Sequence, residues 1–179
     1  MKKIAQILTL SLFLTACGSG RSFQSFFNNH KNDLGVTAFQ VPNFMKALLQ
    51  NISPEINSFF GNVNDFKFIT FTDISPQKQQ ELIQEMNLVT ANGYSDILRK
   101  NTKEKVKVIS VVEDGAIVKR AIVFNSTLTK TSAFYLKGNF DPNRIRELSE
   151  TNQFEDLSNK LIQSYQMPSS VTPGFNPNK

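Results

Sequence analysis

The chain has 179 residues, of which 16 are phenylalanine, one is cysteine and one is histidine. A single cysteine excludes an intramolecular disulfide, and one cysteine with one histidine cannot supply the ligands of a zinc site, so we expect no metal and no cofactor. The 20 basic and 15 acidic residues give a net charge of +5 and are dispersed, which argues against a nucleic acid as partner.

The N-terminal segment has the order of a secretory signal peptide. Lys2-Lys3 precede an apolar run from Ile4 to Leu14, which is shorter than the ~20 residues that a membrane-spanning helix needs. Leu14-Thr15-Ala16-Cys17 ends this segment and resembles the lipobox of bacterial lipoproteins, in which the cysteine receives a lipid before cleavage. Residues 1–16 are therefore predicted to be removed, with Cys17 as the lipid attachment site. The alternative is an ordinary secreted protein with a free thiol.

A helix and a strand are predicted after residues 17–22, which comprise the acylated cysteine and a flexible spacer. Phenylalanines at helical spacing predict a short helix, and these are Phe23, Phe26 and Phe27. The segment from Leu34 to Val41 is typical of a strand, which Pro42 ends.

Two helices are predicted between this strand and the next one. Asn43 is a suitable N-cap for the first helix, and Ser53-Pro54 begins the second, which Gly61 ends. Their apolar faces contain Phe44, Met45, Leu48, Leu49, Ile52, Ile56, Phe59 and Phe60.

The clearest helix of the sequence follows a buried strand. Val63 to Thr72 combines phenylalanine with β-branched residues, as buried strands do. Ser75-Pro76 supplies a cap and a first-turn proline, and Asn92-Gly93 is typical of a left-handed helix end. The apolar side of this helix contains Leu82, Ile83, Met86 and Val89.

From Tyr94 onward the pattern indicates strands joined by turns, which predicts an antiparallel meander. The strands are expected at Ile97-Leu98, Lys105–Val112, Ile117–Phe124 and Thr131–Lys137. Asp141-Pro142 then begins a helical turn with Ile145 and Leu148 inward, and a last helix carries Phe154, Leu157, Leu161, Ile162 and Tyr165.

The predicted fold class is α+β: an antiparallel sheet of about four to five strands, including the C-terminal meander, packed against helices on one face. Residues 23–150 form the domain and residues 151–166 a C-terminal helix. Residues 167–179 are rich in proline, serine and asparagine and are predicted to be a disordered tail.

Several of these segments together resemble a known family. They include Gly35-Val36-Thr37-Ala38-Phe39, the strand-helix unit that ends in Gly93-Tyr94, and Phe134-Tyr135-Leu136-Lys137-Gly138-Asn139-Phe140-Asp141. With the signal peptide, they resemble the domain of unknown function 4252 family of small Bacteroidetes envelope proteins, over roughly Phe23 to Glu150. The resemblance implies a fold and a cell-envelope location, but no reaction and no catalytic residue. It does not extend to the C-terminal helix and tail.

The residues behind Cys17 bear on which side of the membrane the domain faces. Surface-exposed lipoproteins of that group resemble one another in acidic residues just after the cysteine, whereas Gly18-Ser19-Gly20-Arg21-Ser22 has none. Position 18 is also not the aspartate that signals inner-membrane retention in enterobacterial lipoproteins. We therefore expect a lipid anchor in the outer membrane, with the domain facing the periplasm.

The residues that could support catalysis have ordinary surroundings in the sequence. His30 lies in Asn28-Asn29-His30-Lys31-Asn32, which is predicted to be an exposed polar loop, so a catalytic base is not expected there. Glu81 and Glu85 share one helix face and are predicted to be a solvated stripe. Glu113-Asp114-Gly115 is predicted to be a turn. No catalytic residue is therefore assigned.

Two other groups of residues leave alternatives open. Phe44, Phe59, Phe60, Phe66 and Phe68 could line an apolar cavity, although core packing is the commoner use of such residues. The basic run from Arg99 to Lys105 fits either contact with anionic headgroups or a solvated turn.

The function expected from the sequence is that of a lipid-anchored, non-enzymatic envelope protein that binds another envelope protein, in structure or signalling. The alternative is a carrier of a lipid or a small apolar ligand.

Overall fold

The computed structural model describes residues 21–41 and 62–166, with side chains described as far as residue 160. The predicted signal peptide, Cys17, the two helices predicted between residues 43 and 60 and the predicted tail lie outside the described residues. The described elements are α2 (Phe23–His30), β1 (Val36–Gln40), β2 (Val63–Thr72), α5 (Pro76–Thr90), β3 (Ser95–Asn101), β4 (Lys105–Asp114), β5 (Ile117–Thr127), β6 (Lys130–Phe140), α6 (Pro142–Glu150) and α7 (Gln153–Gln166).

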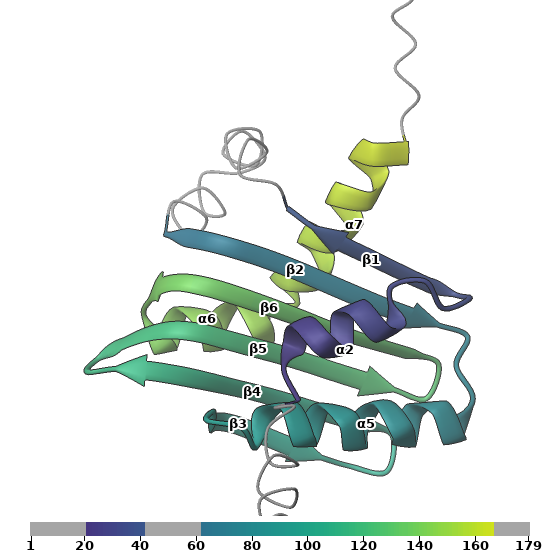
Figure 1. The fold of residues 1–179 in the computed structure, drawn as a ribbon, viewed down its shortest axis with the longest axis horizontal. Helices are drawn as coiled ribbons and strands as arrows, with labels where there is room; N and C mark the ends of the chain where they lie inside the picture. The colour runs from purple at the N-terminus through teal and green to yellow at the C-terminus, as the bar shows by residue number, and fades with distance from the viewer. Residues whose placement is uncertain (1–20, 42–61, 167–179) are drawn as a thin grey trace, which may run out of the picture.

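The described strands form one antiparallel sheet in the order β1-β2-β6-β5-β4-β3 (Figure 1). The C-terminal meander from β3 to β6 is confirmed, as are the α+β class and the antiparallel pairing. The sheet has six strands instead of the expected four to five. The difference arises because the early strands join the meander: β2 pairs with β6 along its whole length, and β1 adds the far edge.

Helices cover both faces of the sheet, so the prediction of helices on one face is wrong. α2 and α5 cross the near face in Figure 1, whereas α6 and the first turns of α7 lie behind it. The physical reason is visible in β2, where Phe66 and Phe68 point to the α6/α7 side while Ile69 and Phe71 point to the α2/α5 side. Because both sets of alternating side chains are apolar, both faces need a cover.

The ends of the helices follow the sequence signals. The Ser75 side chain accepts from the Lys78 N–H at the start of α5, and Pro76 occupies the first turn. Gly93 has a φ of +80°, which glycine adopts at little cost, just after this helix ends. The Ser22 hydroxyl caps α2 by accepting from the Ser25 N–H. These boundaries confirm the predicted first helix and the predicted long helix.

The C-terminal helix α7 packs onto the domain. Phe154 and Leu157 are each only 2% exposed, and the ring of Phe154 stacks on that of Phe134 with 5.5 Å between the ring centroids. Phe134 in turn lies 6.2 Å from the ring of Phe68. The start of α7 is therefore part of the core on the α6/α7 face.

Candidate functional site

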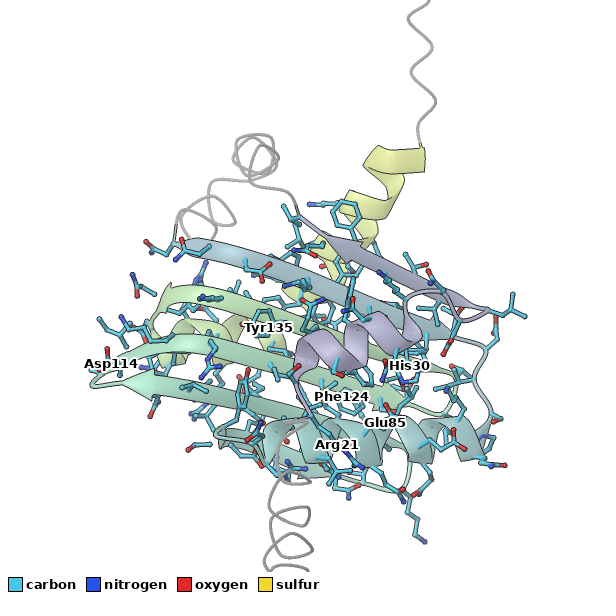
Figure 2. The ribbon with its side chains drawn as sticks, viewed as in Figure 1. Arg21, His30, Glu85, Asp114, Phe124 and Tyr135 are labelled. Atoms are coloured by element: carbon cyan, nitrogen blue, oxygen red, sulfur yellow. The ribbon has the colours of Figure 1, made fainter. Side chains whose placement is uncertain are left out.

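His30 is a buried residue that joins two helices. It is the last residue of α2 and is 7% exposed, with its ring 4.9 Å from that of Phe26 and 5.5 Å from that of Phe71. Its Nδ1 lies 2.8 Å from Asp33 Oδ2, and its Nε2 lies 2.8 Å from Glu85 Oε2 on α5. The prediction of an exposed loop histidine is wrong, and Figure 2 shows His30 and Glu85 side by side between the two helices.

The hydrogen bonds of His30 determine what its imidazole can do. Ionised carboxylates only accept hydrogen bonds, so this arrangement is complete when both ring nitrogens carry a proton and donate. A general base needs a ring nitrogen that is free to take a proton from its substrate. In this geometry His30, at the end of α2, instead contacts Glu85 of α5 directly and Asp33 of the loop that follows α2. Lys78 adds a further charge, with its Nζ 3.8 Å from Asp33 Oδ2.

The side chains of Glu81 and Glu85 are 48% and 42% exposed, as predicted for a solvated helix face, and Glu85 in addition pairs with His30. Glu81 has the expected surface environment, accepting a hydrogen bond from Gln77 on its own helix. The contact of His30 could have been found by extending the helical pattern by one turn. The buried residues of α2 are Phe23, Phe26, Phe27 and His30, a spacing of i, i+3, i+4 and i+7.

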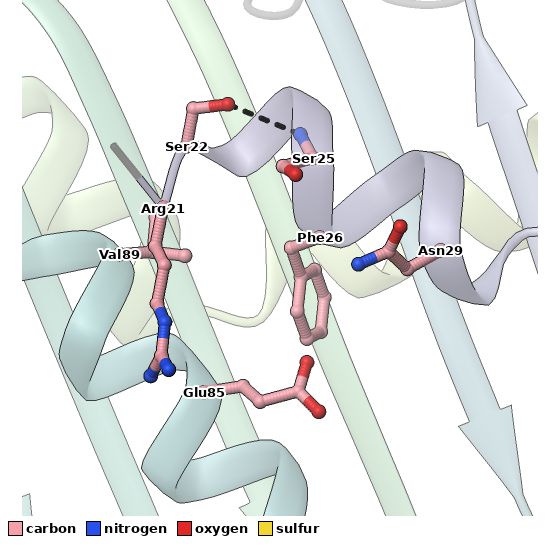
Figure 3. Close-up of a pocket in the computed structure, with 7 residues that line it drawn as sticks. All are labelled: Arg21, Ser22, Ser25, Phe26, Asn29, Glu85 and Val89. Carbon is pink, nitrogen blue, oxygen red and sulfur yellow. Dashed lines mark hydrogen bonds between the residues drawn. The ribbon is translucent and has the colours of Figure 1, made fainter. Parts of the chain in front are cut away.

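A small pocket of about 270 Å³ lies beside this contact, between α2 and α5 (Figure 3). It is lined by Arg21, Ser22, Ser25, Phe26, Asn29, Glu85 and Val89. Figure 3 shows the side chains of Arg21 and Glu85 on the α5 side and the capping bond of Ser22 on the α2 side. The volume lies below the ~300 Å³ at which ordinary ligand sites begin, so there is space only for a small group.

A row of polar residues crosses the opposite face of the sheet. The register places one residue of each strand in this row: Thr37, Thr70, Ser132, Asn125, Lys107 and Lys100. The neighbouring row is apolar and contains Phe39, Phe68, Phe134, Val123, Ile109 and Leu98. Four central members of the polar row, Thr70, Ser132, Asn125 and Lys107, are less than 9% exposed. Polar side chains therefore replace apolar packing along one end of this face.

The α6/α7 corner covers the row and contributes further polar groups. Lys107 Nζ donates to the carbonyl oxygen of Ser149 at 2.6 Å, and Asn125 Nδ2 donates to Glu155 Oε1. Four buried side-chain oxygens have no donor within reach among the described residues, namely Asn125 Oδ1, Ser149 Oγ, Gln153 Oε1 and Glu155 Oε2. Buried polar groups are normally satisfied, so these four oxygens are exceptions within the described residues.

A pocket of about 520 Å³ opens at the same end of the α6/α7 face. It is lined by Leu98, Lys100, Thr102, Lys105, Lys107 and Glu150. Burial lowers the pKa of Lys107, and the positive charges of Lys105 and Lys100 lower it further, whereas Glu155 and Glu150 oppose the shift. Lys100, Lys105 and Lys107 therefore bring three positive charges to one pocket. We call this the lysine pocket.

The basic run that the sequence singled out lies partly in this pocket. Residues 99–105 span the end of β3 and the turn into β4. Arg99 turns away and pairs with Asp96 and Asn87. Lys100 and Lys105, by contrast, line the pocket. The sequence did not identify Lys107, because one lysine within an alternating strand pattern gives no signal of burial.

The other predicted site residues are placed as follows. Cys17 lies outside the described residues, as do Phe44, Phe59 and Phe60. Phe66 and Phe68 are at most 1% exposed and pack ring to ring in the core. The predicted turn at Glu113-Asp114-Gly115 lies one residue later in the structure: Glu113 and Asp114 end β4, and Gly115, with a φ of +63°, forms the turn to β5 with Ala116.

Two further observations concern the described residues only. Among residues 21–41 and 62–166, no cluster of three or more histidine, cysteine or carboxylate side chains is arranged to hold a metal ion. None of the helices in these ranges is both long enough and apolar enough to cross a membrane.

Comparison with known proteins gives a match to a family model. No curated protein and no solved structure is significantly similar to this chain. The model of the domain of unknown function DUF4252 matches residues 28–148, which is more than half of the chain and runs from α2 to α6. The match agrees with the span of the resemblance seen in the sequence and leaves out α7. The chain therefore belongs to the DUF4252 family.

Proposed function

We propose that this protein is a lipid-anchored component of a bacterial cell envelope whose domain binds another envelope protein and catalyses no reaction. The anchor in this proposal is Cys17, at the end of the lipobox-like Leu14-Thr15-Ala16-Cys17. The expected modification supplies more than one acyl chain, which stable anchoring requires. The spacer without acidic residues favours the periplasmic side of the outer membrane.

One observation carries the non-enzymatic part of the proposal. The single histidine of the chain has both ring nitrogens bound to carboxylates and its ring enclosed by Phe26 and Phe71. A catalytic triad or a histidine-based acid needs a ring nitrogen that faces a substrate. His30 instead connects α2 to α5, so its role in this proposal is to hold the fold together.

The anchor is tested by metabolic labelling. Cells producing the full chain are supplied with radioactive palmitate, and the protein is then captured and analysed for the label. We expect labelling of the unmodified sequence and none of Cys17→Ser. Absence of label from the unmodified protein, or equal label in both, would contradict a lipid at Cys17.

The partner is tested by affinity capture of the tagged full chain from detergent-solubilised envelopes. An unrelated lipoprotein with the same tag serves as the control for sticky proteins. We expect at least one envelope protein to be enriched reproducibly over this control, and to remain enriched with His30→Gln at a temperature at which that variant is folded. Repeated captures without an enriched protein would count against a protein partner. Lipid enriched in the same captures would favour the carrier alternative.

A further inference from the structure

The lysine pocket gathers positive charge without an equal number of direct acidic partners. Lys100 and Lys107 are directly opposite each other on β3 and β4, and Lys105 lies two residues before Lys107 on the same side of β4. No ion pair within 4 Å involves these three lysines in the described residues, whereas Lys67 and Lys119 each have one and Lys78 has two. Like charges directly opposite one another on a sheet are destabilising.

The floor of the pocket is held in a fixed position. Lys107 is 8% exposed, and its Nζ donates to the Ser149 carbonyl, which uses one of its three N–H groups. The rim is formed by exposed residues of the β3–β4 hairpin, where Thr102 and Lys105 hydrogen-bond to each other across the turn. A rigid, partly buried ammonium with two others above it is an arrangement suited to an anion.

We propose that the lysine pocket binds a phosphate group, with Lys107 as the buried donor and Lys100 and Lys105 as the rim. A phosphate carries up to two negative charges and several acceptor oxygens, so one group can receive bonds from all three ammoniums. The pocket, about 520 Å³, is also larger than a single phosphate needs. The phosphate can therefore be part of a larger molecule, either a small phosphate ester or the headgroup of a phospholipid.

Glu150 provides an internal check, because it lines the same pocket with the opposite charge. A carboxylate beside a bound phosphate is repulsive, so neutralising it is expected to strengthen binding rather than weaken it. Neutralising a lysine of the pocket is therefore predicted to weaken phosphate binding, and neutralising Glu150 is predicted to strengthen it.

The test uses the full chain in micelles of a neutral detergent, titrated with inorganic phosphate by calorimetry and by NMR of the β3–β4 amides. We expect saturable binding that weakens about tenfold with Lys100→Gln or Lys105→Gln, which each remove one charge-assisted bond. Glu150→Gln is expected to tighten binding about threefold, the size of a partly screened repulsion. Lys103→Gln is the matched control, since it removes the same charge from the same hairpin outside the pocket.

Both rim lysines are exposed, so their variants are expected to fold, and Lys107→Met is used only if its unfolding curve matches that of the unmodified chain. Absence of saturable phosphate binding would overturn the proposal. An equal loss with Lys103→Gln would also overturn it, because the effect would then be general electrostatics. Micelles containing phosphatidylglycerol distinguish the source: if they compete with inorganic phosphate at these amides, the ligand is a phospholipid, and if they do not, it is a soluble phosphate compound.

Discussion

Helices pack on both faces of the sheet, but the two faces differ in whether their buried polar groups have hydrogen-bond partners. On the α2/α5 face the buried polar groups are paired: His30 binds Asp33 and Glu85, and Ser126 bonds Thr131 with 2.8 Å between the hydroxyl oxygens. Among the described residues, the four buried side-chain oxygens without a donor belong to Asn125 of the polar row and to Ser149, Gln153 and Glu155 of the α6/α7 corner. Buried polar groups are thus paired with one another on the α2/α5 face, whereas some acceptors of the α6/α7 face have no donor among the described residues.

The largest expected effect tests whether both faces are packed cores. Phe124 faces α2 and α5, Phe134 faces α6 and α7, and both are at most 1% exposed. Replacing either by alanine is expected to lower the free energy of unfolding by about 3–5 kcal/mol, from lost burial and the cavity left behind. Urea denaturation of the full chain measures the free energy of unfolding of each variant. Leu88→Ala, at a position 45% exposed on α5, is the control and is expected to change the free energy of unfolding by less than ~0.5 kcal/mol. A small loss for only one phenylalanine would mean that its face is not a packed layer.

A smaller effect tests the polar pairing on the α2/α5 face. His30→Gln removes an imidazole that bonds two carboxylates, and we expect it to lower the free energy of unfolding by about 1–3 kcal/mol. Glu81→Gln on the same helix is the control, since Glu81 lies on the surface, and it should stay within about 0.5 kcal/mol of the unmodified chain. If the two variants proved equally stable, the contact between α2 and α5 would contribute nothing measurable.

The smallest effect concerns a tyrosine on the α2/α5 face. Burial raises the pKa of Tyr94 from its ordinary 10.0 to about 12, with the neighbouring Tyr135 adding to the shift and Arg120 opposing it. The unfolded chain loses this proton near pH 10 and the folded chain only near pH 12, so stability is complete below pH 10 and falls as the pH rises through this window. Burial also raises the pKa of Tyr135, so the ultraviolet absorbance of tyrosinate should show late ionisation that Tyr94→Phe reduces. A spectrum in which every tyrosine ionises together near pH 10 would contradict the burial of Tyr94.

The elements of the fold could largely be predicted from sequence patterns, because each has a strong local signal. The predicted strand from Val63 to Thr72 matches β2 residue for residue, and the predicted cap at Ser75 begins α5. The layering could not be predicted in the same way. Apolar side chains on both sides of β2 carry the information, but which elements cover each side depends on contacts between distant parts of the chain. The second helical layer became evident only from long-range packing.

The candidate sites were harder to predict, because their residues come together across distant parts of the chain. His30 and Glu85 are 55 positions apart, and each appears solvated within its own segment. The polar row takes one residue from each of six strands, so it depends on the register between strands and not on any local motif. Cys17 is the opposite case, since its assignment rests wholly on the residues directly before it.

The lipid anchor at Cys17 is tested most directly by intact mass spectrometry of the mature protein purified from envelopes. The predicted result is an N-terminus that begins at Cys17 and carries added mass from more than one acyl chain. A mature chain with an unmodified thiol at Cys17, or one that still contains residues 1–16, would contradict the account.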